Sequence, residues 1–85
     1  MHIQVKFFAS LREKIGVSQM SLDLPQEVKT IGDLRLELAK HSPGWDEIFA
    51  PQQNMRAAQH QVMVESTTLL EDGAEIAFFP PVTGG

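Results

Sequence analysis

The 85-residue sequence contains no cysteine, and this absence excludes several kinds of chemistry. Without a thiol the chain has no disulfide, no thiolate metal site and no cysteine nucleophile or redox centre. Any sulfur that the protein handles must therefore be carried on a group other than a side-chain thiol. The sequence also lacks an excess of basic residues, because seven Lys and Arg stand against eleven Asp and Glu, a net charge of −4. We therefore expect no nucleic-acid partner.

Long hydrophobic runs are missing as well, since no stretch approaches the roughly 20 apolar residues that cross a bilayer. The first residues have the pattern of a strand rather than that of a signal peptide, so we expect a cytoplasmic protein with no membrane partner. What is present is an ordinary globular composition, with 42% hydrophobic and 21% charged residues. A chain of this length suits one hydrophobic core. We expect one folded domain over residues 1–79.

Alternating hydrophobic residues predict a strand at each end of this domain. Residues 2–8 alternate apolar and polar side chains, with Phe8 as an aromatic exception on the polar face. Residues 74–79 alternate in the same way, and Phe79 points away from the core-facing positions. These two strands are the most apolar, so we expect them side by side and parallel at the centre of a sheet.

Three further strands and one main helix complete the expected fold. The strands are residues 18–24, which form a hairpin with the first strand, and residues 55–59 and 61–65, which meet at a turn. The main helix begins after Thr30, whose hydroxyl can cap it while Asp33 places a carboxylate in the first turn. One helix packed on one face of a mixed five-stranded sheet is an α+β fold, a ubiquitin-like β-grasp roll.

Smaller expectations concern the connections. We expect Ser10 to cap a short helical turn and Arg35 to face water from the main helix. Residues 45–54 show no clear period, and we expect their hydrophobic residues to pin the segment to the edge of the core. Leu69 and Leu70 should cover the bottom of the core.

The last residues depart from these patterns. Pro80 and Pro81 cannot continue a central strand, because proline fixes φ and has no amide hydrogen. The chain then ends in Val82, Thr83, Gly84 and Gly85. Glycine has no Cβ, so a tail of this kind can lie extended in a channel too narrow for side chains. We expect residues 80–85 to form a flexible tail that presents its terminal carboxylate to another protein.

The alternation also places Phe8 and Phe79 on the same side of two neighbouring strands. With Ala77, Pro80 and Pro81 they would form an exposed apolar patch beside the tail. A contiguous apolar cluster on a surface usually marks a partner site. We therefore expect an interface here; the alternative is that one of the two rings tucks under a loop.

Other candidate chemistry is sparse. The histidines His2, His41 and His60 are far apart in sequence and lack the spacing of metal ligands, so we expect no metal site. The serines and threonines belong to no nucleophile motif, and no glycine-rich phosphate loop is present. We expect no self-contained active site and no permanently bound cofactor.

Two segments resemble a known family. Val5-Lys6-Phe7-Phe8-Ala9, followed by Leu11-Arg12-Glu13 and Gly16, is similar to the opening of the small subunit of molybdopterin synthase. Residues 71–85, which read Glu-Asp-Gly-Ala-Glu-Ile-Ala-Phe-Phe-Pro-Pro-Val-Thr-Gly-Gly, resemble the end of that family more closely still. The middle departs from the family: His60-Gln61 stands where many relatives have Asn-Gln, and Ala74 where Asp is common.

What the resemblance implies is a sulfur carrier in molybdenum cofactor biosynthesis. In that family an adenylating enzyme uses ATP to convert the terminal carboxylate, here that of Gly85, into an acyl-adenylate. A sulfur donor protein then replaces AMP and leaves a thiocarboxylate. The large subunit of molybdopterin synthase binds a cyclic pyranopterin monophosphate and receives the sulfur-bearing tail, and the complex is usually a heterotetramer.

The resemblance also implies roles for the residues before Gly85. Val82, Thr83 and Gly84 would fill the channel of the large subunit, and Pro80 and Pro81 would limit the entropy lost when the tail docks. Phe8 and Phe79 would anchor the domain against the adenylating enzyme and the large subunit in turn, in mutually exclusive complexes.

Two other functions stay open on these residues. Sulfur carriers for thiamine synthesis or tRNA thiolation share the fold and the chemistry. A ubiquitin-like modifier would instead be joined to lysines through an isopeptide bond. A passive interaction domain with an inert tail is a more distant alternative.

Overall fold

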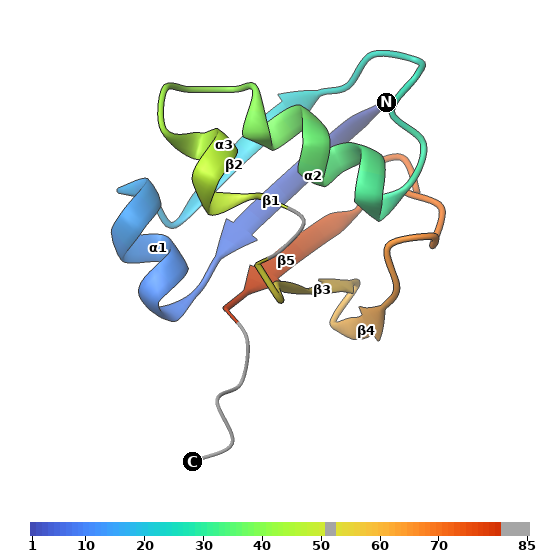
Figure 1. The fold of residues 1–85 in the computed structure, drawn as a ribbon. Helices are drawn as coiled ribbons and strands as arrows, with labels where there is room; N and C mark the ends of the chain where they lie inside the picture. The colour runs from blue at the N-terminus through green and yellow to red at the C-terminus, as the bar shows by residue number, and fades with distance from the viewer. Residues whose placement is uncertain (51–52, 81–85) are drawn as a thin grey trace.

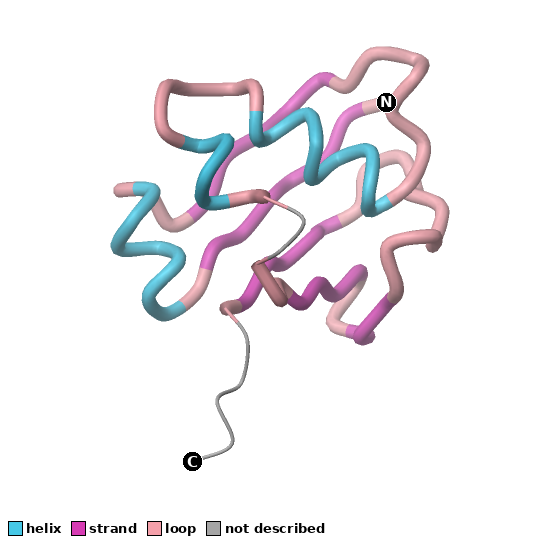
Figure 2. The backbone as a smooth tube through the Cα atoms, in the orientation of Figure 1, coloured by secondary structure: helices cyan, strands magenta, loops and turns pink. Residues whose placement is uncertain are grey.

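The computed structural model describes residues 1–50 and 53–80 (Figure 1). In this part of the chain the sheet consists of β1 (His2–Phe7), β2 (Gln19–Asp23), β3 (Arg56–Gln59), β4 (Val62–Val64) and β5 (Glu75–Phe79). The helices are α1 (Ala9–Ile15), α2 (Ile31–Ala39) and α3 (Trp45–Ile48). The strand order is β2-β1-β5-β3-β4, and α2 crosses one face of the sheet (Figure 2).

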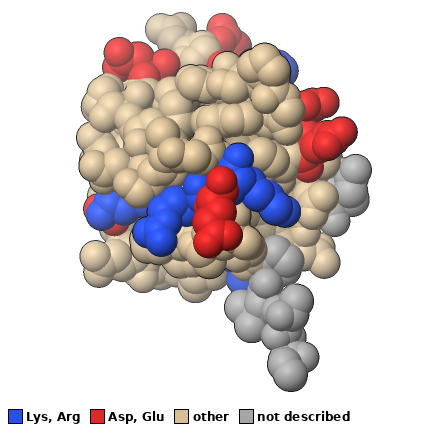
Figure 3. All heavy atoms as spheres, turned by 90° about the vertical axis from the view of Figure 1, so that its left-hand side faces the viewer, with Lys and Arg blue, Asp and Glu red and all other residues tan. Residues whose placement is uncertain are grey.

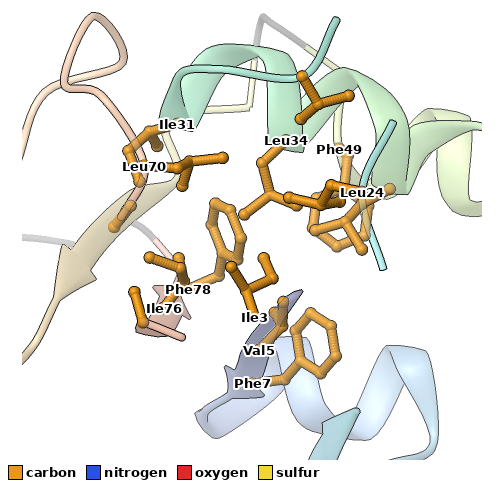
Figure 4. Packing of buried hydrophobic residues seen from close by; sticks show 14 of the residues in the cluster. Ile3, Val5, Phe7, Leu24, Ile31, Leu34, Phe49, Leu70, Ile76 and Phe78 are labelled. Atoms are coloured by element: carbon orange, nitrogen blue, oxygen red, sulfur yellow. The ribbon is translucent and has the colours of Figure 1, made fainter. Parts of the chain in front are cut away.

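The two central strands are β1 and β5, and they run parallel as the sequence predicts. Val5 is in register with Ile76, and Phe7 with Phe78, so the large side chains of both strands point to the same face. These four side chains are almost completely buried. They pack with Leu34 of α2 and other apolar residues into one core under the helix (Figure 4). The outer pairs β1–β2, β3–β5 and β3–β4 are antiparallel.

A capping box fixes the start of α2. The side chain of Thr30 accepts a hydrogen bond from the Asp33 amide at 3.1 Å. In return, Asp33 Oδ2 accepts from the amides of Lys29 and Thr30 at 3.0 and 3.2 Å. The hydrogen bonds from the backbone of Lys29 and then Thr30 lower the pKa of the Asp33 carboxyl below its ordinary value of 3.8. The predicted helix start is thus confirmed in its details.

The prediction that Ser10 caps the first helix is wrong. α1 begins two residues earlier than a Ser10 cap would place it, at Ala9, and its N-cap residue is Phe8, which has extended backbone angles and no side-chain cap. The chain passes from strand to helix without a loop, so Ser10 already lies inside the first turn. The other end is as expected, because Gly16 closes the helix with a left-handed φ of 91°.

Two hydrophobic segments agree with the expectation in part. Phe49 is buried and Trp45 and Ile48 pack against the core, so the hydrophobic residues after residue 44 hold this segment at the core edge as predicted. Trp45–Ile48 forms the short helix α3 after the left-handed Gly44, and four residues are too few to show a helical period in the sequence. Leu70 is buried as predicted, but Leu69 is 68% exposed. Leu69 bridges to Thr30 in an extended segment, and there only one of two neighbouring side chains can point inward.

Arg35 is half-buried, whereas the sequence predicts full exposure to water. Its Nε donates a hydrogen bond to the Phe49 carbonyl at 3.0 Å, and its Nη2 donates to the carbonyls of Ala50 and Gln53. Burial lowers the pKa of the guanidinium below its ordinary value. The helix period places Arg35 at the edge of the apolar stripe, and the long side chain reaches from there to the segment after α3.

Replacing Arg35 with methionine should destabilise the protein by about 2 kcal/mol, because three carbonyl groups lose a charged donor. Urea unfolding monitored by circular dichroism measures this loss. Lys40→Met is the matched control, since Lys40 is exposed at the end of the same helix, and its effect should stay within about 0.5 kcal/mol. Equal effects of the two substitutions would show that the carbonyl contacts contribute nothing.

The lowered pKa of Asp33 predicts an acid-sensitive part of the stability. A carboxyl whose pKa is lower in the folded than in the unfolded state stabilises the fold above the unfolded value. This contribution disappears as the pH falls through the folded value. Asp33→Asn should therefore be less stable than the parent chain at pH 7, and the two should converge in acid. Unfolding curves at pH 7 and at about pH 2 test this, with Glu37→Gln as the control on the same helix. A constant difference at both pH values would contradict the prediction.

Candidate functional site: an aromatic pair at the base of the tail

The face of the sheet opposite α2 carries Phe8 and Phe79 as a stacked pair. Their ring centroids are 5.0 Å apart and the ring planes differ by 13°. The parallel register of β1 and β5 continues for one step, because the Phe8 amide donates a hydrogen bond to the Phe78 carbonyl at 3.3 Å. Phe8 is 39% exposed and Phe79 is half-buried. The alternative that one ring lies under a loop is therefore not what the structure shows.

Small residues surround the pair on two neighbouring strands. Ala77 lies two residues before Phe79, and Ala58 of β3 is its cross-strand partner. Both alanines are buried, with 4% of Ala58 and 9% of Ala77 exposed, so the expectation that Ala77 is exposed is wrong. The same row ends at Met63 of β4, which is in register with Ala58 and is 54% exposed. We call the accessible residues Phe8, Met63 and Phe79, together with the buried alanines Ala58 and Ala77 of the same face, the open-face patch.

Met63 is a residue of this patch that the sequence analysis did not single out. Its two neighbours, Val62 and Val64, are also hydrophobic, so the three-residue strand shows no alternation in the sequence. The register with Ala58 is what assigns Met63 to the open face. The sequence offers one signal for this register. If the two short strands are paired residue by residue outward from the turn at His60 and Gln61, Met63 falls opposite Ala58.

Charged side chains lie at the edges of the patch. Lys6 is in register with Ala77 and forms an ion pair with Glu75, with 3.3 Å between Nζ and Oε1. Arg56 is in register with Phe79 and is exposed. An apolar centre with charged groups at its rim is the usual anatomy of a protein–protein interface.

Pro80 lies between this patch and the helices. It follows Phe79 directly, is half-buried, and borders a cavity that is also lined by Leu11 of α1 and Ile48 of α3. The structure thus separates Pro80 from the open face on which the sequence analysis had placed it. The other predicted tail residues, Pro81, Val82, Thr83, Gly84 and Gly85, lie outside the described residues.

The three histidines lie in different parts of the fold. His2 contacts Asp23, with 2.7 Å between Nδ1 and Oδ1, and His60 lies 3.9 Å from Glu71. His41 stacks on Trp45 with a centroid distance of 4.9 Å. Within residues 1–50 and 53–80, no three acidic or histidine side chains converge as a metal site would require. The same part of the chain contains no helix that is long and apolar enough to span a bilayer.

Comparison with known proteins gives consistent matches along the chain. Residues 5–85 match the family model described as the ThiS family. The molybdopterin synthase sulfur carrier subunit of Escherichia coli (strain K12) is 39% identical, over 98% of this chain and 99% of its own length. The subunit of the same name from Haemophilus influenzae is 35% identical, with the same coverage of both chains.

Solved structures show the same architecture. SAMP1 from Haloferax volcanii superposes with a TM-score of 0.79 at 23% identity, over the whole of both chains. A putative molybdopterin converting factor subunit 1 from Pyrococcus furiosus has a TM-score of 0.76 at 26% identity, over 96% of this chain and 99% of its own. One chain of a complex of subunits 1 and 2 of the molybdopterin-converting factor from Helicobacter pylori has a TM-score of 0.64 at 24% identity, over the whole of both chains. The predicted β-grasp fold is confirmed.

Proposed function

Because the chain belongs to the ThiS family, we propose that it is the sulfur carrier subunit of a molybdopterin synthase. The observation that carries this proposal is the 35–39% identity, over nearly the whole length, with two curated proteins of that name. The terminal Phe-Phe-Pro-Pro-Val-Thr-Gly-Gly supports it further. A carrier for thiamine synthesis or tRNA thiolation would use the same fold, but the relatives' name and this terminal run favour molybdopterin synthase.

The reactive group in this proposal is the carboxylate of Gly85. A carboxylate is a poor electrophile, so a separate adenylating enzyme first joins it to AMP and releases pyrophosphate from ATP. Sulfur delivered by a donor protein at the oxidation level of hydrosulfide then attacks the carbonyl carbon, the bond between that carbon and the AMP oxygen breaks, and AMP leaves. The resulting thiocarboxylate is ionised near neutral pH and is a good nucleophile, a property that no side chain of this cysteine-free chain offers.

The folded domain would present this group to the large subunit. Phe8 and Phe79 supply the apolar anchor of the open-face patch, and Met63 enlarges it on the side of β4. Gly84, with Val82 and Thr83, would enter the channel of the large subunit, where sulfur passes to a cyclic pyranopterin monophosphate. The Helicobacter pylori complex of two subunits, one of which shares this fold, supports a large-subunit partner.

The same patch would also meet the adenylating enzyme. Apolar anchors of this size contribute most of the energy of an interface, so two partners that need them compete. The carrier would therefore leave the adenylating enzyme before it can bind the large subunit. Pro80 and Pro81 would restrict the conformations of the free tail, so less conformational entropy would be lost each time the tail docks to a partner.

The carrier chemistry predicts a change of mass. Incubation with the adenylating enzyme, ATP and a sulfur donor should add about 16 Da to the intact chain, the exchange of oxygen for sulfur at the activated carboxyl group. Intact-protein mass spectrometry measures this gain. A chain lacking Gly85 is the control: it should keep its circular dichroism spectrum and gain no mass. An unchanged mass of the full chain would be strong evidence against the carrier role.

The interface role of the patch predicts a loss of affinity. Phe79→Asp should weaken binding to the large subunit by about 2 kcal/mol, roughly 30-fold, because a buried anchor is replaced by a charge. Titration calorimetry gives this value. Leu36→Asp is the matched control, since Leu36 is an exposed leucine on α2, on the other side of the sheet. If both variants bind as the parent chain does, the patch is not the interface.

A further inference from the structure

A small cavity lies on the helix side of the sheet, next to Pro80. Its volume is about 280 Å³. Leu11 of α1, Ile48 of α3, Met55 and Pro80 supply its apolar surface. Leu11 is buried and the other three are half-buried, so the floor is fixed by the core.

The size of the cavity limits what can occupy it. Pockets for small-molecule ligands and cofactors usually enclose about 300–1,000 Å³. At about 280 Å³ this cavity lies at the lower limit of that range, and it has room for one amino-acid side chain.

The apolar floor of the cavity disfavours a charged occupant, while the rim carries one charge of each sign. Lys14 of α1 and Glu47 of α3 both line it, and both are exposed. Seen from the side of α1, basic side chains flank an acidic one on the surface (Figure 3). The opposite charges of Lys14 and Glu47 leave the rim with no net preference for either sign. A charged side chain entering the cavity would lose its hydration against the apolar floor, which is costly. An uncharged apolar side chain avoids this cost.

The cavity is continuous with the open-face patch through two short connections. Phe8 of the patch is the N-cap residue of α1, and the next turn of that helix contributes Ser10 and Leu11 to the cavity. On the other strand, Phe79 is followed directly by Pro80. The patch and the cavity therefore lie on the two sides of the point at which residue 80 leaves the sheet. A protein that binds the tail therefore comes close to both the open-face patch and the cavity.

We infer that this cavity is an anchor site for a single uncharged apolar side chain of the large subunit. The inference rests on the proposed function and adds a second contact to it, on the opposite side of residue 80 from the open-face patch. Buried anchors in pockets are the contacts that dominate interface energies. The two contacts together would fix the direction in which the tail leaves the domain.

Filling the cavity tests this inference. Ser10→Leu adds an apolar side chain at its edge, in a helical position that tolerates leucine. Titration calorimetry of the full chain with the purified large subunit should show affinity reduced at least tenfold. Glu13→Leu makes a comparable change on the same helix, at an exposed residue that does not line the cavity, and should change affinity less than twofold. Unchanged binding by Ser10→Leu overturns the inference.

Methyl NMR on the unmodified sequence provides a second measurement that needs no variant. The methyl signals of Ile48 and Met55 should shift when the large subunit is added, while those of Leu36 on α2 should not. If the methyl signals of Ile48 and Met55 do not shift at a saturating concentration of the large subunit, the inference is overturned, even if Ser10→Leu binds weakly or fails to fold. If the large subunit does not bind the parent chain at all, the proposed function fails with it. If Phe79→Asp weakens binding but both cavity tests are negative, only the anchor site is wrong.

Discussion

The pairing of β1 with β5 is the interaction on which the rest of this structure depends. It joins the first and last strands of the domain in parallel, with hydrogen bonds from the Gln4 amide to the Ala74 carbonyl and from the Phe8 amide to the Phe78 carbonyl. Bringing these distant strands together costs loop-closure entropy once, and the other contacts of the core can then form without that cost. A slip of one residue would exchange the two faces of a strand, and would move either Phe8 or Phe79 from the open face into the core.

The same pairing gives the two faces of the sheet different roles. On the core side, Phe7, Phe49 and Phe78 pack edge to face or tilted, with centroid distances near 6 Å, and hold the ends of both strands (Figure 4). On the open side, Phe8 and Phe79 follow directly on Phe7 and Phe78 in the chain. The exposed pair therefore stands on a backbone that buried aromatics keep in place, so little side-chain or backbone entropy has to be lost when a partner binds.

The accuracy of the sequence-based predictions follows from how local each signal is. Alternation fixes the face of each residue in β1 and β5, and Thr30 with Asp33 specifies a helix start within four residues, so both were correct. Arg35 and Met63 could not be placed in this way. The partners of Arg35 are carbonyls of a segment without a period, and the face of Met63 is set by its register with Ala58 alone. The cavity could not be predicted from the sequence for the same reason. It is lined by residues of α1 and α3 and by Met55 and Pro80, which no single sequence pattern connects.

The placement of the candidate contacts suits a protein whose reactive group lies at the chain terminus. If the chemistry takes place on Gly85, the domain cannot contribute by shaping a pocket around its own reactive atom. It can contribute only through the position and direction of the tail relative to a partner. One contact beside the tail leaves rotation about that contact free, whereas two contacts on opposite sides restrict it. Because catalysis depends on orientation to within about an ångström, a contact on each side of residue 80 is what a carrier of this kind needs.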